Sequence, residues 1–208
     1  MLNILAQPYG PYQVNTILVW CERTKQAVLF DPTFESEDII EEIERRGLTL
    51  RYLVNTHGHL DHIALNDVIK AQFKVPLLIH ELDRPMLTNP IKNLSLLTGE
   101  PITSPDADRT LKEGDTLQIG EDNLQVFHVP GHTPGSLVFY YPGFVITGDT
   151  LFEGGVGRTD LPGMNEAELY QNIRTKIYTL PEDTIVYPGH GSSTTVGEER
   201  RNNPFVRA

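Results

Sequence analysis

Residues 56–63, THGHLDHI, place three histidines and one aspartate within six consecutive positions of a chain that has only seven histidines. The stretch directly follows RYLVN, a short apolar run typical of a buried β-strand. In an extended loop alternate side chains point the same way, so His57, His59 and Asp61 share one direction, and His62 points in the next. Imidazole nitrogens and carboxylate oxygens are the usual protein ligands of zinc, iron and manganese. The stretch therefore predicts a metal site at the end of a strand.

Three further metal-binding side chains follow other predicted strands, each in a loop that contains glycine. His132 lies in PGHTPGS after NLQVFHV, Asp149 lies in ITGDT after FVITG, and His190 lies in VYPGHGSS after TIVY. Loops at one edge of a sheet converge, and glycines let the backbone approach an ion closely. Because a carboxylate has two oxygens, one aspartate can bridge two cations roughly 3.5–4 Å apart. The economical assignment places His57, His59 and His132 on one cation, Asp61, His62 and His190 on the other, and Asp149 between them.

Composition and charge exclude several classes of function. The formal net charge is −11 and the basic residues are scattered, whereas nucleic-acid binding leaves a basic footprint. No apolar run approaches the roughly 20 residues of a membrane-spanning helix, and the N-terminal stretch does not resemble a signal peptide. Cys21, the single cysteine, lies in an apolar stretch and fits a reducing compartment. We therefore expect a cytoplasmic protein with a small-molecule substrate and no nucleic-acid or membrane partner.

The order of the predicted elements favours one domain over residues 1–208 that contains two sheets. Residues 14–30 form a predicted hairpin, and apolar spacing predicts helices at 36–47, 62–73 and 165–180. Strands follow one another directly in the second half of the chain. Two mixed sheets with helices packed outside them satisfy this order.

Local sequence features suggest where two of these helices begin and where a long loop lies. Ser36 is the expected N-cap of the first helix, and Asn165 with Glu168 forms a capping box at the start of another. Residues 88–109 form a long proline-containing loop, and loops of this length in compact domains are often functional or mobile.

The H-x-H-x-D-H pattern, followed in order by His132, Asp149 and His190, resembles the metallo-β-lactamase superfamily. GHTPGS, GDTLFEGGVGRTDLPG and YPGHGSSTTVGEERRNNPF are similar to segments of its single-domain, bacterial glyoxalase II-like hydrolases, close to the persulfide dioxygenase branch. The resemblance implies an α/β fold, an αββα sandwich of two mixed β-sheets flanked by helices. It also implies two divalent metal ions, zinc foremost and iron or manganese as alternatives, at one edge between the sheets.

The resemblance implies a hydrolase that cleaves a thioester by a metal-bound hydroxide. The implied substrate is an S-2-hydroxyacylglutathione such as S-lactoylglutathione, and Asp61 would orient the hydroxide and pass a proton to the leaving group. Arg158, in GRTD, has two interpretations. It pairs with Asp160 to fix the loop, which is the favoured interpretation, or it anchors a carboxylate of the substrate.

The principal alternative is a mononuclear iron persulfide dioxygenase acting on glutathione persulfide. In that case His57, His132 and Asp149 would hold the iron as a two-histidine, one-carboxylate face. The other histidines and Asp61 would then support those ligands. A lactonase shares the same metal ligands, and a non-catalytic module would be expected to have lost some of them.

Three other residues near predicted strand ends have less specific interpretations. We expect a capping or surface role for His80 and a buried, hydrogen-bonded imidazole for His128. Tyr187 either donates a hydrogen bond in the pocket or packs in the sheet.

Overall fold

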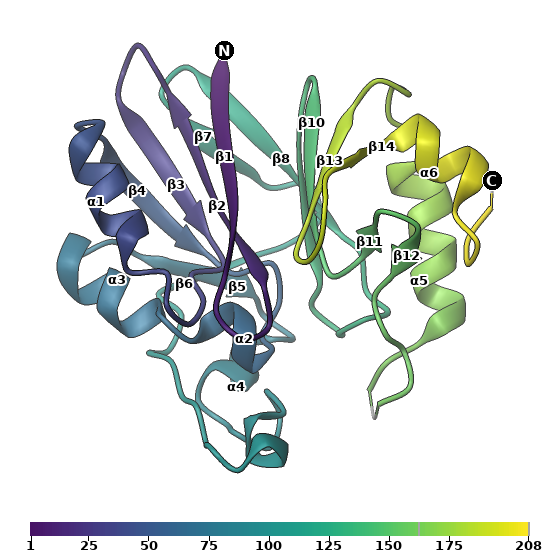
Figure 1. Ribbon diagram of the computed structural model, residues 1–208, viewed down its shortest axis with the longest axis horizontal. Coiled ribbons are helices and arrows are strands. Elements are labelled where there is room, and N and C mark those ends of the chain that lie inside the picture. Colours follow the sequence, from purple (N-terminus) through teal and green to yellow (C-terminus); the bar gives the residue numbers. More distant parts are fainter. Residues whose placement is uncertain (162, 208) are drawn as a thin grey trace.

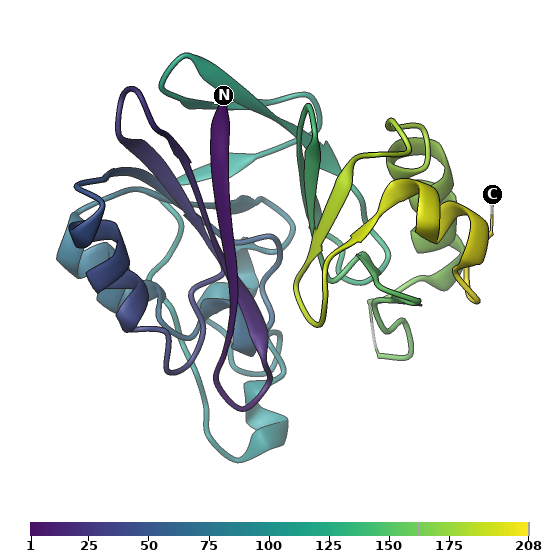
Figure 2. The same cartoon turned by 45° about the horizontal axis from the view of Figure 1, so that its top comes forward.

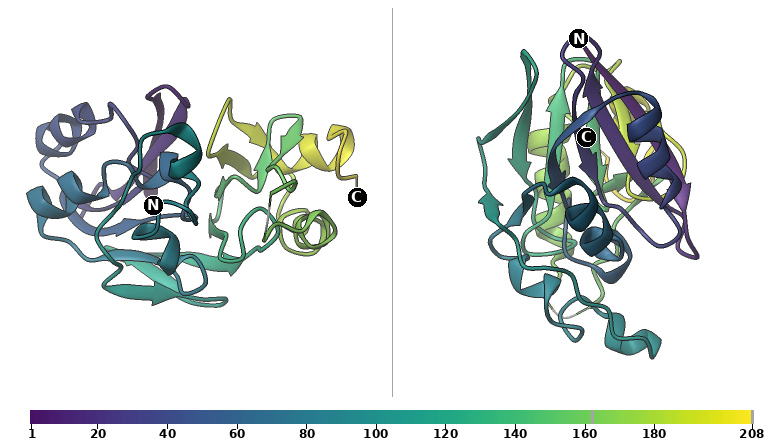
Figure 3. Two further views of the ribbon diagram at one scale, coloured as in Figure 1. Left: turned by 90° about the horizontal axis from the view of Figure 1, so that it is seen from below. Right: turned by 90° about the vertical axis from the view of Figure 1, so that its left-hand side faces the viewer.

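The computed structural model describes residues 1–161 and 163–207. Two six-stranded sheets stack face to face, and helices cover the outer face of each (Figure 1). Figure 2 and the view from below in Figure 3 show the same layers, with the N-terminal sheet and its helices on one side. This is the αββα sandwich that the resemblance implied. No helix in the described residues is long and apolar enough to cross a membrane.

The first sheet is antiparallel at one side and parallel at the other. Its strands β1 to β3 pair antiparallel, and β3 to β6 pair parallel. The predicted hairpin is present as β2 and β3, whereas β1 was not predicted. The strands are β1 (Leu2–Tyr9), β2 (Val14–Cys21), β3 (Gln26–Phe30), β4 (Thr49–Val54), β5 (Leu77–His80) and β6 (Arg109–Leu111).

The second sheet has the order β14-β13-β10-β9-β8-β7 and is also mixed, because β10 pairs parallel with β13. A separate two-stranded ribbon, β11 (Leu151–Phe152) with β12 (Gly155–Val156), follows β10. The sheet strands are β7 (Thr116–Ile119), β8 (Asp122–His128), β9 (Leu137–Tyr141), β10 (Phe144–Gly148), β13 (Ile185–Pro188) and β14 (Thr194–Thr195).

The helices fall into two groups with different positions. Four helical segments cover the sheets and three short ones lie at the lower edge of the sandwich in Figure 1. The covering segments are α1 (Asp38–Arg45), α3 (Asn66–Phe73), α5 (Glu166–Asn172) with its π-helical continuation η2 (Ile173–Ile177), and α6 (Val196–Asn202). The edge segments are α2 (Leu60–Ile63), α4 (Arg84–Leu87) and the 3₁₀-helix η1 (Ser95–Thr98).

Strand β2 shows why the sequence builds layers. Alternate side chains of a strand face opposite ways. Ile17 and Val19 enter the core between the sheets, while Leu18 and Trp20 enter the core under α1 and α3. Both faces are covered, which fits the continuous apolar run at residues 17–21 of this strand.

Two local predictions were wrong. The predicted helix 62–73 is two helices, since Leu65 leaves helical geometry and its N–H donates to the Pro32 carbonyl (3.0 Å). Ser36 does not cap α1: its hydroxyl donates to the Thr33 carbonyl (2.7 Å), and Glu37 occupies the cap position.

The cap prediction at Asn165 was correct in part. Its side chain accepts a hydrogen bond from the Glu168 N–H (3.2 Å). Its own N–H donates to the carbonyl of Gly131 (2.8 Å), so Asn165 also ties the start of α5 to the loop after β8.

Asp83 joins the loops of the two sheets at the lower edge of the sandwich. Its buried carboxylate accepts hydrogen bonds from the N–H of Gly58, in the loop after β4 (3.2 Å). It also accepts from the Thr133 hydroxyl (2.6 Å) and the Gly135 N–H (2.7 Å), in the loop after β8. One side chain therefore fixes the two loops relative to each other.

We expect Asp83→Ala to lower the free energy of unfolding by roughly 2–4 kcal/mol, because it leaves three buried donors without an acceptor. Urea denaturation monitored by circular dichroism measures this. Asp106→Ala, which breaks an exposed ion pair with Arg84, is the control and should have a far smaller effect. Equal losses in the two variants would contradict the role assigned to Asp83.

Candidate metal centre

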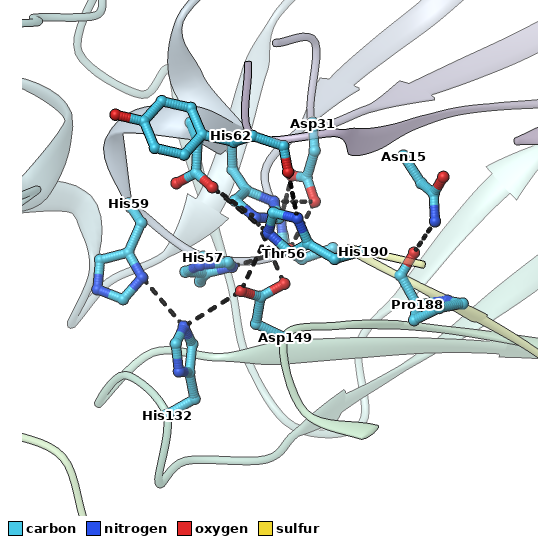
Figure 4. Close-up of polar contacts among 12 residues, drawn as sticks. Asn15, Asp31, Thr56, His57, His59, His62, His132, Asp149, Pro188 and His190 are labelled. Atoms are coloured by element: carbon cyan, nitrogen blue, oxygen red, sulfur yellow. Dashed lines mark hydrogen bonds and ion pairs between the residues drawn. The ribbon is translucent and has the colours of Figure 1, made fainter. Parts of the chain in front are cut away.

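The seven side chains singled out by sequence come together at the lower edge of the sandwich (Figure 4). Each lies at or just beyond the C-terminal end of a strand, as expected from the convergence of loops at a sheet edge. The loop after β4 and helix α2 supply four of them, and the loops after β8, β10 and β13 supply one each. These residues are His57, His59, Asp61 and His62, then His132, Asp149 and His190.

Their potential ligand atoms form three overlapping groups, each with all atoms within 4.8 Å of one another. One group is His57, His59 and His132, and another is Asp61, His62 and His190. The third, made of His57, His62 and Asp149, connects the other two. The structure thus brings together the same two triads that the sequence suggested, with Asp149 between them.

Distances between donor atoms fit a shared cation. His132 Nε2 lies 3.0 Å from His59 Nδ1 and 3.6 Å from Asp149 Oδ2. His190 Nε2 lies 3.4 Å from Asp61 Oδ2 and 3.5 Å from Asp149 Oδ2. Ligands about 2.1 Å from a tetrahedral zinc ion are about 3.4 Å apart. The donor atoms are therefore spaced like ligands around an ion.

Three of these donor atoms are buried with no hydrogen-bond partner among the described residues: His57 Nε2, His62 Nε2 and Asp149 Oδ1. Buried polar atoms are nearly always satisfied, and leaving one unpaired costs about 1–3 kcal/mol. All three belong to the group that connects the two triads. A divalent cation would satisfy them, so the residues fit a metal centre.

Hydrogen bonds made by the opposite ring nitrogens set the orientation of four histidines. His62 Nδ1 lies 2.9 Å from Asp31 Oδ2, and His57 Nδ1 lies 3.2 Å from the Thr56 hydroxyl. His132 and His190 direct Nδ1 to backbone carbonyls, those of Arg158 and Tyr12, each at 2.9 Å. Each contact turns Nε2 toward the centre, as outer partners of metal-bound histidines do.

Asp31 is a functional residue that the sequence reasoning missed. It is buried and accepts hydrogen bonds from the Thr56 N–H (2.8 Å) and hydroxyl (2.6 Å) as well as facing His62. The signal was present, since Asp31 directly follows the apolar strand β3, as Asp149 follows β10.

Two glycines bring the backbone against the site. A Cβ atom at Gly189 would overlap Asp149 Oδ1 and lie 2.9 Å from the His62 ring. A Cβ at Gly157 would overlap the backbone of Asp149 and lie 3.0 Å from the His132 ring. The missing side chains leave room for the ligands, as the glycine-containing loops suggested.

Burial keeps His57 and His59, two histidines of the first triad, neutral. It lowers the pKa of His57 well below its ordinary value, with a further contribution from His62. Burial and the neighbouring His132 lower the pKa of His59 to about 3. Neutral imidazole is the form that binds a metal, so His57 and His59 are poised for coordination.

The second triad attracts positive charge. Burial opposes charge on His62, but Asp149 and other carboxylates outweigh it and raise its pKa well above the ordinary value. Burial likewise opposes charge on His190, yet contacts with Asp149 and Asp61 raise its pKa to about 10. Burial acts to raise the pKa of Asp149, and His62 with His190 reverses this and holds it well below its ordinary value. In the absence of a cation, protonated His62 and His190 therefore balance the negative charge of the carboxylates.

A cleft of ≈ 620 Å³ opens above the cluster, and its floor includes His59, Asp61, His132, Asp149 and His190. Its walls are mostly apolar and include residues from the connection between β5 and β6, from the β11–β12 ribbon and from the loop after β12. These wall residues are Tyr12, Leu60, Leu94, Leu97, Thr98, Phe152, Val156, Arg158 and Leu161.

The structure distinguishes the interpretations of the remaining residues. Arg158 lines the cleft, and its guanidinium donates two hydrogen bonds to Asp160 (2.8 and 3.0 Å), which is the loop-fixing pair. His80 is buried, so the surface role is wrong, but its Nδ1 accepts a hydrogen bond from the Leu82 N–H (3.2 Å), as a capping role predicts. Its ring stacks on His128 with ring centroids 4.0 Å apart. His128 is half-buried and not buried as predicted, but its Nε2 lies 2.8 Å from the Pro134 carbonyl, as expected of a hydrogen-bonded imidazole. Tyr187 packs in the sheet against Phe144.

Comparison with known proteins places the chain in a family. Residues 9–190 match the family model of the metallo-beta-lactamase superfamily. The chain therefore belongs to that superfamily.

Three relatives show how far the similarity extends. The hydroxyacylglutathione hydrolase GloC of Haemophilus influenzae is 37% identical over 100% of this chain and 99% of its own. The crystal structure of the B3 metallo-beta-lactamase BLEG-1 superposes with a TM-score of 0.93 at 40% identity, covering 99% of this chain and 100% of its own. TTHA1623, solved in a di-iron-bound form, has a TM-score of 0.85 at 36% identity and covers 97% of this chain and 100% of its own.

Gly189→Ala should sharply reduce the metal content of the purified protein, since the added methyl group would displace Asp149. Elemental analysis by mass spectrometry measures bound metal per chain. Gly155→Ala is the matched control, because its Cβ would meet its nearest neighbour at an ordinary 3.5 Å. Wild-type metal content in Gly189→Ala would argue against the proposed arrangement.

Metal binding at pH 7 should release protons, because His190 has a pKa of about 10 and must become neutral to coordinate. Calorimetric titration with zinc in two buffers of different ionisation enthalpy measures the release, which should shrink as the pH approaches 10. His190→Gln should release fewer protons. Heats independent of the buffer would contradict this prediction.

The same shift has a consequence for stability without metal. The pKa of His190 in the folded chain lies above the ordinary value of 6.5. This group therefore stabilises the fold fully below pH 6.5, and its contribution is lost as the pH rises toward 10.

Proposed function

We propose that this protein is a dinuclear metallo-hydrolase that cleaves a thioester, with an S-2-hydroxyacylglutathione such as S-lactoylglutathione as its substrate class. The observation that carries the proposal is a set of three buried ligand atoms without a hydrogen-bond partner among the described residues, beneath an open cleft: His57 Nε2, His62 Nε2 and Asp149 Oδ1. The superfamily match and the similarity to a hydroxyacylglutathione hydrolase support the reaction class.

The proposed ligands are the two triads with Asp149 between them, and zinc is the first candidate for both cations. Two such cations would lower the pKa of a water from about 15.7 to about 7 and so supply a nucleophile at neutral pH. Among the described residues that line the cleft there is no serine or cysteine that could take this role. The di-iron form of TTHA1623 supports a two-cation centre and makes iron a second candidate.

We assign Asp61 the role of orienting the attacking water and passing a proton toward the leaving thiol. Burial acts to raise its pKa, but His62 and His190 outweigh this and lower it, so the carboxylate is ionised at neutral pH. Asp61 lines the cleft, and its Oδ2 lies 3.4 Å from His190 Nε2. An ionised carboxylate in this position can accept a hydrogen bond from water.

The apolar walls hold the substrate in a partly dehydrated cleft. Leu60, Leu94, Phe152 and Val156 surround the floor, and burial of the substrate against them excludes bulk water. Arg158 lies on the same wall with its guanidinium paired to Asp160, so substrate anchoring by Arg158 requires exchange of that partner.

The mononuclear iron dioxygenase would use His57, His132 and Asp149 alone. The geometry favours two cations, because Asp61, His62 and His190 form a converging group of their own. The two proposals differ in metal content and in oxygen consumption, so one set of measurements separates them.

The test is elemental analysis of the purified protein followed by a substrate screen. We expect two metals per chain and hydrolysis of S-lactoylglutathione that is lost with a chelator and restored by added metal. One iron per chain with oxygen uptake on glutathione persulfide would establish the alternative. Turnover only of a β-lactam or an acyl lactone would keep the hydrolase and replace the substrate.

Asp149→Ala should lower kcat/KM by more than about 100-fold. Loss of an outer partner of a metal site costs up to about 100-fold, and loss of a direct ligand should cost more. Steady-state assays with parallel metal analysis measure the effect. Asp67→Ala, which removes an exposed carboxylate of α3, is the control and should behave like the wild type. Full activity of Asp149→Ala would overturn the proposed centre.

A further inference from the structure

A second hollow, of ≈ 430 Å³, lies beside the cleft and is mostly apolar. It shares four lining residues with the cleft: His59, Leu94, His132 and Leu161. Two of these are proposed metal ligands, so the hollow adjoins the reacting centre directly. The apolar side chains that line this hollow and not the cleft are Leu82, Met86, Ile91, Pro134 and Met164. We call it the apolar hollow.

Two of these apolar side chains are open to water, since Leu82 is 52% exposed and Ile91 is 69% exposed. Large apolar side chains exposed around a hollow commonly mark a binding site. An apolar group bonded to an atom at the metal centre would reach this hollow by passing Leu94 and Leu161.

Leu94 has an unusual backbone conformation, with φ +69° and ψ 2°. This left-handed region is costly for a residue with a Cβ atom and is occupied chiefly by glycine. A leucine at this position therefore adopts a backbone conformation that its own side chain disfavours, and strain of this kind concentrates at functional sites.

The neighbours of Leu94 impose this conformation. Asn93 is buried and its side-chain amide donates to the carbonyls of Met86 (3.0 Å) and Ile102 (2.9 Å). Ser95 is also buried and its hydroxyl accepts from the Ile102 N–H (2.8 Å). Leu94 is therefore held between two anchored residues in the long loop that the sequence marked at 88–109.

The same loop is tied to the metal-ligand stretch. The Leu60 N–H, directly after His59, donates to the Asn93 carbonyl (3.0 Å). The position of the Leu94 side chain is thus fixed relative to the proposed ligands as well as relative to the loop.

We propose that Leu94 is a specificity-determining residue: it narrows the passage from the metal centre into the apolar hollow, which receives the unbranched alkyl part of the substrate's acyl group, beyond its hydroxyl-bearing carbon, and excludes branched or cyclic alkyl parts. The inference rests on the proposed thioester hydrolysis and names the acyl group that this site accepts. The polar thiol of the substrate then occupies the wider cleft, whose floor carries the charged residues.

Leu94→Gly tests the passage without endangering the fold, because glycine adopts the left-handed conformation without strain. The measurement is the ratio of kcat/KM for cyclohexanecarbonyl-glutathione to that for hexanoyl-glutathione. We expect this ratio to rise about tenfold or more, the effect of a methylene-sized change in an apolar pocket. Lys74→Gly is the matched control, since Lys74 also has a positive φ (52°) but ends α3, outside both sets of lining residues. An unchanged ratio in Leu94→Gly would overturn the inference.

A binding measurement tests whether the apolar hollow receives an alkyl chain, independently of hydrolysis. Calorimetry on the metal-loaded wild type should show S-hexylglutathione binding more tightly than S-methylglutathione, by up to about fourfold per methylene. Leu82→Asp should abolish most of this gain, whereas Leu96→Asp should not. Leu82 and Leu96 are both 52% exposed, but only Leu82 lines the hollow.

The two proposals fail in different ways. Chain-length-dependent binding without hydrolysis of any thioester would overturn the proposed function and leave the apolar hollow as a binding site. Hydrolysis with no dependence on chain length, or with equal effects of Leu82→Asp and Leu96→Asp, would overturn this inference alone.

Discussion

The packing of five imidazoles and two carboxylates into one buried cluster creates an electrostatic demand that the rest of the structure serves. His57 and His62 each direct a buried Nε2 into the cluster, and Asp149 directs a buried Oδ1, with no hydrogen-bond partner among the described residues. Such atoms are costly unless an ion satisfies them. The protons drawn to His62 and His190 show the same demand, because carboxylates concentrate negative charge there.

The fold meets this demand by bringing strand ends from two sheets to one edge. The two sheets share a central core, and the outer face of each packs against its own helices, so the loops can differ without loss of the framework. Hydrogen bonds across the gap then set the geometry. Asp83 connects the loops that carry Gly58 and Gly135, and Asp31 orients His62 from the end of β3. Precision at the site therefore depends on outer residues as much as on the ligands themselves.

The edge loops also shape what can approach the centre. Residue Leu94 lies between the cleft and the apolar hollow, in a backbone conformation imposed by Asn93 and Ser95. The strain is local, and the anchoring hydrogen bonds that offset it are buried. Rigid placement of an apolar side chain beside charged ligands gives the site a means of selecting acyl groups without altering its chemistry.

Sequence alone determined the donors and the strands that carry them. The spacing of THGHLDHI, the strand-end positions of His132, Asp149 and His190, and the continuous apolar runs are local patterns, and the physical rules that connect them to structure are local too. The seven candidate ligands and the two-sheet architecture could be predicted for that reason, the latter helped by a family resemblance. Strand β1 and the break between α2 and α3 could not, because pairing partners and tertiary hydrogen bonds decide them.

Tertiary structure decided which residues support the ligands and which shape the entrance. Asp31 and Asp83 act through contacts with residues 25 or more positions away. Leu94 has a conformation imposed by Asn93 and Ser95, whose side chains are hydrogen-bonded to Met86 and Ile102 in the folded loop. A local pattern holds no record of such contacts, since a buried carboxylate that accepts three hydrogen bonds and an exposed one that accepts none have the same letter. Only the folded chain distinguishes the two carboxylates, because it buries one of them beside its hydrogen-bond donors and leaves the other in water.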